Sequence, residues 1–61
     1  MQPLLPPRQM DILETARREG RVTGDSLATR FDVTPQTIRK DLNDLCDREI
    51  LDRVHGGAVF P

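Results

Sequence analysis

The sequence predicts a mainly α fold with three helices and a small β-hairpin. Three stretches carry apolar residues at helical spacing, and each has its own start or stop residue. After the third stretch the pattern changes to short apolar runs around a Gly-Gly pair. The chain has 61 residues, of which 36% are hydrophobic, so it can form one small domain with one modest core. The predicted order is helix, short strand, helix, tight turn, helix and hairpin.

The first segment is an arm followed by a helix. Residues 1–7 hold three of the five prolines and show no regular period, so they are expected to form a flexible N-terminal arm outside a folded domain of residues 8–61. The helix begins near Pro7, which suits a first helical position, and Gly20 follows the last turn, where a left-handed residue closes a helix. Its apolar face consists of Ile12, Leu13 and Ala16.

A short strand and a second helix come next. Val22 and Thr23 are β-branched and follow the helix stop, so they can form a single short strand if a later segment pairs with it. The Thr23 hydroxyl can also cap the second helix. The apolar residues of this helix recur at i, i+1 and i+4; they are Leu27, Ala28 and Phe31. The pattern stops at Asp32, so the helix has barely two turns.

The third helix is predicted over residues 35–48. Thr34 followed by Pro35 is a strong start signal, because the hydroxyl accepts a backbone N–H and proline occupies a position where its missing donor does no harm. The core-facing stripe consists of Ile38, Leu42, Leu45 and Cys46. The opposite, polar face consists of Gln36, Lys40, Asn43 and Asp47.

A β-hairpin is predicted over residues 50–60. Short apolar runs flank Gly56 and Gly57, and a two-residue hairpin turn favours glycine because both central residues need a positive φ. The expected turn is therefore the Gly-Gly pair itself.

The second and third helices have the spacing of a helix-turn-helix unit. Few residues separate them, so they must cross at a steep angle. Ala28 is small where the helices approach, Val33 fills the interior of the turn, and Ile38 faces back into the core. Asp32 stands where such units often have a left-handed glycine, and an Asp is tolerated there at a small cost.

A helix held in this way can read DNA, because the major groove is about 12 Å wide and admits one α-helix by its N-terminal half. Gln can pair with an adenine edge, Arg with guanine or phosphate, and Lys, Thr and the helix N-terminus with phosphate. The hairpin adds a second contact to the backbone or minor groove, which makes it a wing. The candidate DNA-binding residues are Pro35, Gln36, Thr37, Arg39 and Lys40 on the helix, with Arg53 and His55 on the wing.

Asp41 would repel phosphate, so we expect it to pair with an arginine such as Arg53, or with a backbone donor, and to hold the wing against the helix.

Composition excludes several other classes of protein. The chain has one cysteine, Cys46, and one histidine, His55, so it cannot form an internal disulfide and has too few ligands for a structural zinc ion. We do not expect Cys46 to be a catalytic nucleophile, because the sequence shows no general base at a suitable spacing from it. We expect no enzyme activity, metal or cofactor. No apolar run suits a membrane span or signal peptide, so a cytoplasmic protein is expected. Nine basic and ten acidic residues give a net charge of -1, which leaves open a winged-helix module that binds proteins without binding DNA.

Two motifs resemble a known family. The run Thr34-Pro35-Gln36-Thr37-Ile38-Arg39-Lys40-Asp41-Leu42-Asn43-Asp44-Leu45, followed by Arg53-Val54-His55-Gly56-Gly57-Ala58, is similar to the N-terminal winged helix-turn-helix domain of DeoR-family bacterial transcription regulators. Within that family the Pro-Gln-Thr-Ile-Arg run most resembles the branch of glycerol-3-phosphate regulon repressors. The resemblance implies DNA contacts by Thr37, Arg39 and Lys40, base reading by Gln36, and wing contacts by Arg53 and His55.

The resemblance also implies a setting for the domain. It implies a repressor of sugar or polyol catabolism that binds double-stranded operator DNA and is released by a phosphorylated sugar acting on a separate C-terminal domain, which is absent from this chain. It implies that the full-length protein is a homo-oligomer. Glu49 departs from the family pattern, which has glycine or asparagine there; if the position needs a positive φ, Glu49 costs of order 1 kcal/mol.

Overall fold

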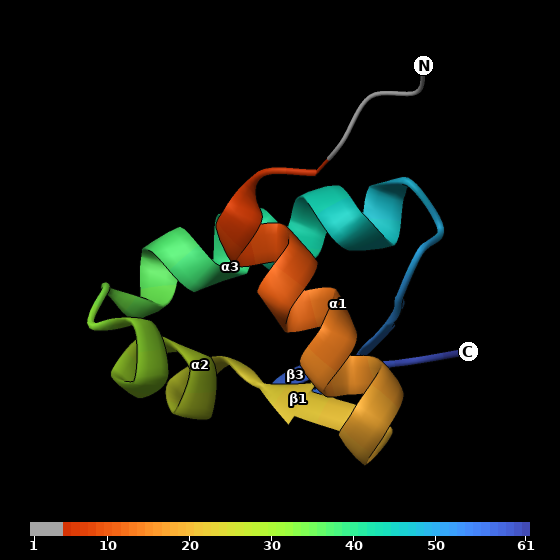
Figure 1. Ribbon diagram of the computed structural model, residues 1–61, viewed down its shortest axis with the longest axis horizontal. Helices are drawn as coiled ribbons and strands as arrows, with labels where there is room; N and C mark the ends of the chain where they lie inside the picture. The colour runs from red at the N-terminus through yellow and green to blue at the C-terminus, as the bar shows by residue number, and fades with distance from the viewer. Residues whose placement is uncertain (1–4) are drawn as a thin grey trace.

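The computed structural model describes residues 5–61, which form three helices and a three-stranded antiparallel sheet (Figure 1). The elements in chain order are α1 (Pro7–Glu19), β1 (Arg21–Thr23), α2 (Gly24–Phe31), α3 (Pro35–Asp47), β2 (Asp52–Val54) and β3 (Gly57–Val59). The predicted fold class and element order are confirmed. Most of the predicted arm, residues 1–4, lies outside the described residues, and Leu5 packs partly against the core.

The first two helices begin and end at their predicted signals. Pro7 opens α1, and Gly20 closes it in the left-handed conformation with φ 85°, donating its N–H to the carbonyl oxygen of Ala16 at 2.6 Å. Thr23 caps α2, because its Oγ1 accepts the N–H of Ser26 at 3.2 Å. The end of α1 is therefore set by the backbone conformation of Gly20, and the start of α2 by the side chain of Thr23.

Two non-glycine residues adopt the left-handed conformation. Asp32, with φ 58°, ends α2 as the helix-turn-helix spacing predicted. Glu49 has φ 63°, so the residue that departs from the family pattern does occupy a position that favours glycine, at a cost of about 1 kcal/mol. The third helix ends at Asp47, one residue before the predicted end, and Arg48 caps it.

The last strand of the chain is the centre of the sheet. The strand order is β1-β3-β2, and both pairings are antiparallel. Val22 of β1 faces Ala58 of β3, and Arg53 of β2 faces Ala58 from the other side. The later partner that β1 required is therefore the second strand of the hairpin.

The hairpin turn lies one residue earlier than predicted. Val54 and Gly57 face each other, so His55 and Gly56 are the central residues of the turn, and the Gly-Gly pair is not. Of the two, only Gly56 has a positive φ, 80°. Gly57 belongs to β3, where an added Cβ would lie 2.0 Å from the carbonyl oxygen of Val22. Position 57 requires glycine because β1 approaches closely there, and not because of the turn.

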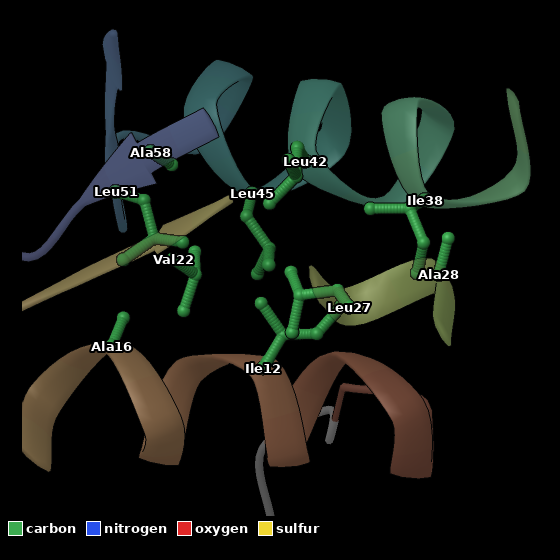
Figure 2. Packing of buried hydrophobic residues seen from close by; sticks show 10 residues of the cluster. All are labelled: Ile12, Ala16, Val22, Leu27, Ala28, Ile38, Leu42, Leu45, Leu51 and Ala58. Atoms are coloured by element: carbon green, nitrogen blue, oxygen red, sulfur yellow. The ribbon is translucent and has the colours of Figure 1, made fainter. Parts of the chain in front are cut away.

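The core lies between α1 and α3, with α2 and the sheet closing its two ends (Figure 2). Ile12, Leu27 and Leu45 point toward one another between the helices. The buried apolar residues are Ile12, Ala16, Val22, Leu27, Ala28, Ile38, Leu42, Leu45, Leu51 and Ala58. Cys46, predicted on the core-facing stripe, is only partly buried. Leu51, predicted within the hairpin, precedes β2 and is 1% exposed, so it belongs to the core.

Candidate nucleic-acid interface

The N-terminal end of α3 is exposed and capped. Thr34 Oγ1 accepts the N–H of Thr37 at 3.3 Å, and the two hydroxyl oxygens lie 3.0 Å apart. Thr37 is therefore half-buried within the cap, and part of its hydrogen-bonding capacity is already used. Pro35 is the first helical residue, and the first turn contains no acidic side chain. The positive end of the helix dipole is therefore exposed, and no acidic side chain of the helix's own first turn neutralises it.

The charged and amide side chains predicted to contact DNA are exposed. Gln36, Arg39 and Lys40 are all solvent-exposed on the first half of α3, while Ile38 between them is fully buried. This half of the helix therefore has one face in the core and a polar face that is open to a ligand. His55 is also exposed, at the tip of the hairpin.

A concavity of about 370 Å³ separates α3 from the hairpin. Arg39 and Arg53 approach it from different elements, and Asp25 at the start of α2 supplies a carboxylate. The residues that line it are Gly24, Asp25, Pro35, Arg39, Leu42, Arg53, Gly56 and Gly57. Two guanidinium groups against one carboxylate leave its walls with a surplus of positive charge.

Arg53 is fastened to α3 by a residue that the sequence analysis did not assign to the site. Its Nη1 donates a hydrogen bond to Oδ1 of Asn43. Both residues are exposed, so this contact joins the edge strand β2 to the solvent face of α3. The available signal was the position of Asn43 on the polar face of the helix, which predicts exposure but identifies no partner.

The prediction that Asp41 holds the wing was wrong. Asp41 is 7% exposed and pairs with α1: Arg8 donates to both of its carboxylate oxygens, with Nη2 at 3.3 Å from Oδ1, and Gln9 Nε2 donates to Oδ1 at 3.2 Å. The hydrogen bond to Asp41 raises the pKa of the Arg8 guanidinium above its ordinary value. An arginine does neutralise this carboxylate, as expected, but it comes from the first turn of α1. The reason is geometric, since Asp41 lies on the side of α3 that faces α1.

The described residues give little support for metal binding, membrane crossing or catalysis by Cys46. Within residues 5–61, no three His, Cys, Asp or Glu side chains lie close enough together to hold a metal ion, and no helix is both long and apolar enough to cross a bilayer. Burial raises the pKa of the Cys46 thiol; Arg53 opposes this effect, and Asp47 and Asp52 add to it. The thiol is therefore protonated at neutral pH and is a poor nucleophile.

A capped helix that follows a tight turn, with a hairpin against its side, defines the winged helix-turn-helix class of DNA-binding domains. The family described as the DeoR-like helix-turn-helix domain matches residues 8–61. The chain belongs to this family, and it is a DNA-binding domain of the kind found in transcription regulators.

Individual relatives agree with this assignment. The chain is 43% identical over 54 residues to the glycerol-3-phosphate regulon repressor of Escherichia coli (strain K12), covering 88% of this chain and 21% of that protein. It is 42% identical over 48 residues to the L-fucose operon activator of Haemophilus influenzae, covering 79% of this chain and 19% of that protein. It is 38% identical over 52 residues to the transcriptional repressor AccR of Agrobacterium fabrum, covering 85% and 20%.

The chain therefore spans about a fifth of the length of these relatives. No solved structure matches it. The relatives are transcription regulators, so the DNA-binding prediction is supported and the alternative, a winged helix that binds only proteins, is not.

Proposed function

We propose that this domain binds operator DNA by inserting the first half of α3 into the major groove, with the hairpin on the adjacent backbone. The observation that carries the proposal is the outward face of that half-helix, where Gln36, Arg39 and Lys40 are exposed and the first turn has no acid. Gln36 has both a donor and an acceptor with which to read a base edge, Arg39 has donors for a guanine edge or a phosphate, and Lys40 contacts phosphate. Arg53 and His55 contact the backbone from the wing.

Two of the three acidic residues of α3 pair with arginines, and the third, Asp47, is the last residue of the helix. Asp41 is buried against α1, where Arg8 neutralises it. Asp44 lies one turn further along and forms an ion pair with Arg48 at 3.3 Å. Because both carboxylates have cationic partners within the domain, the repulsion that a nearby phosphate meets is smaller than the net charge of -1 suggests.

The names of two relatives support a proposal about the genes that the protein controls. One relative is named for the glycerol-3-phosphate regulon and another for the L-fucose operon, one as a repressor and the other as an activator. We propose that the protein represses a sugar or polyol catabolic operon in the bacterial cytoplasm. In this proposal a C-terminal domain beyond this chain binds a phosphorylated sugar and joins the subunits into a homo-oligomer. No catalytic activity is proposed for the DNA-binding domain.

The test begins with selection of a duplex from a pool of randomised double-stranded DNA. The protein should bind the selected duplex more tightly than a scrambled one. Its affinity for the selected duplex should fall steeply as salt rises, and a plot of log K against log salt concentration should have a slope of about -0.9 for each phosphate neutralised. Arg39→Ala should weaken specific binding by about 1 to 3 kcal/mol. Arg17→Ala serves as the matched control, because Arg17 is an exposed arginine on α1, paired with Glu14. Equal affinity for both duplexes, or no loss with Arg39→Ala, would contradict the proposal.

A further inference from the structure

The contact between Arg53 and Asn43 gives the wing a defined position against α3. We propose that Asn43 is a positioning residue, which holds Arg53 beside Arg39 so that both guanidinium groups bind the same DNA phosphate. The inference rests on the proposed function and adds to it a residue, Asn43, and a ligand, one phosphodiester group of the backbone. It starts from the hydrogen bond that Arg53 Nη1 donates to Asn43 Oδ1.

The edge strand needs such a contact. β2 has three residues and pairs with β3 alone, so its other edge is not held by a neighbouring strand. Leu51, just before the strand, is anchored in the core, but beyond it Asp52 and Arg53 are exposed. The side-chain bond from Arg53 to Asn43 therefore links the exposed part of the strand to the helix.

The bond leaves Arg53 free to bind an anion. A guanidinium carries five N–H donors, and Asn43 accepts from one nitrogen, so donors remain for a phosphate. Arg53 and Arg39 line the same concavity, one from the hairpin and the other from α3. With about 370 Å³ of space between these elements, a phosphate oxygen can approach both guanidinium groups.

The chemistry of the acceptor matters as much as its position. An amide oxygen holds the arginine without adding a negative charge, whereas a carboxylate at the same place would neutralise it. Asp25 already supplies one carboxylate to the concavity, so a second from position 43 would remove the surplus of positive charge. Asn43 thus orients Arg53 and preserves its charge for the ligand.

Two variants of Asn43 separate orientation from charge. With the duplex chosen by selection, Asn43→Ala should weaken binding about 3- to 10-fold, because Arg53 must then be ordered by the DNA itself. Asn43→Asp should keep the fold and the bond to Arg53 and still weaken binding at least as much. Thr29→Ala is the matched control, since Thr29 is an exposed polar residue on α2. Circular dichroism tests whether each variant is folded. If Asn43→Ala does not fold, the affinity of Asn43→Asp provides the test.

Coupling to one phosphate is the decisive measurement. The affinity is measured for duplexes in which one phosphate at a time is replaced by a neutral methylphosphonate. In the wild type, replacing one particular phosphate should weaken binding more than replacing any other. In Arg39→Ala and in Arg53→Ala, replacing that same phosphate should no longer weaken binding. Asn43→Ala should reduce the effect at the same position, and the Asn43→Ala/Arg53→Ala double variant should bind no more weakly than Arg53→Ala alone.

The outcomes distinguish this inference from the function on which it rests. Wild-type affinity in both Asn43 variants, independent losses in the double variant, or different phosphates for Arg39 and Arg53 would overturn the role of Asn43 while selective DNA binding stands. Failure of the wild-type protein to prefer its selected duplex over a scrambled one would overturn both.

Discussion

Gly57 offers the sharpest test of how the wing is built. An added Cβ in Gly57→Ala would lie 2.0 Å from the carbonyl oxygen of Val22 and 2.9 Å from Cα of Thr23. Both neighbours are backbone atoms of β1, so neither can rotate out of the way. Ordinary van der Waals contact is about 3.5 Å, so β1 and β3 would have to separate locally by more than about 1 Å.

The size of the effect follows from what that separation removes. The backbone hydrogen bonds between β1 and β3 are worth about 0.5 to 1.5 kcal/mol each. Val22 is 5% exposed, and fully burying a valine side chain is worth about 1.5 to 3 kcal/mol, of which a part would be lost. The expected destabilisation is about 2 to 4 kcal/mol. A domain of this size has about 3 to 9 kcal/mol in total, so Gly57→Ala removes a large share of its stability.

Two other glycines in the same region are matched controls. Gly56→Ala meets open space but keeps a φ of 80°, which costs an alanine about 1 kcal/mol. Gly24→Ala places its Cβ 3.8 Å from the carbonyl oxygen of Gly56, an ordinary contact, at the first position of α2. It should be neutral or stabilising by about 0.4 to 1 kcal/mol.

Thermal and urea unfolding, followed by circular dichroism, measure the three variants. The order of stability should be Gly24→Ala, then Gly56→Ala, then Gly57→Ala, with the melting temperature of the last lowered by about 10 °C or more. If Gly57→Ala were as stable as Gly56→Ala, the close approach of β1 would not be the reason for glycine at this position. The role assigned to Gly57 would then be refuted.

Three further predictions concern α3 and its surroundings. Asp41→Ala should lower the free energy of unfolding by about 1 to 3 kcal/mol, measured in urea, because it leaves Gln9 and Arg8 without their shared acceptor; an unchanged midpoint would contradict a role for this cluster in joining α1 to α3. Thr34→Ala should cost about 0.5 to 2 kcal/mol through loss of the α3 cap, and Thr34→Ser should restore most of it. Because burial raises the pKa of the Cys46 thiol, the native state holds that proton more tightly than the unfolded chain, so stability should fall as pH rises above the ordinary thiol pKa. Cys46→Ser should flatten that alkaline slope, and an identical slope in both proteins would assign it to other groups.

Helix boundaries could be predicted because their signals are local. Thr34 caps α3 through the backbone N–H of a residue three positions away, and Gly20 closes α1 through its own φ. The exposure of Gln36, Arg39 and Lys40 follows in the same way from the periodicity of one helix. Such features need no knowledge of how the helices pack.

The misplaced contacts depend on packing between distant segments. Asp41 was expected to pair with an arginine such as Arg53, or with a backbone donor, and to hold the wing, but the packing of α1 against α3 brings Arg8 to it, from 33 positions earlier in the chain. The reason for glycine at position 57 is likewise a strand far back in the sequence, β1, rather than the turn beside it. Composition and spacing do not tell which of several arginines contacts Asp41, or which strand packs against Gly57.

The sheet order β1-β3-β2 has a consequence for synthesis on the ribosome. Because the central strand is the last to be made, neither outer strand has a partner until residues 57–59 have left the exit tunnel. The three helices are complete by residue 47, so a nascent chain that ends between residues 47 and 57 contains all three helices while Val22 of β1 still lacks its partner strand. Residues 57–59 supply the central strand, so the sheet and the wing form last and depend on the length of chain that has emerged.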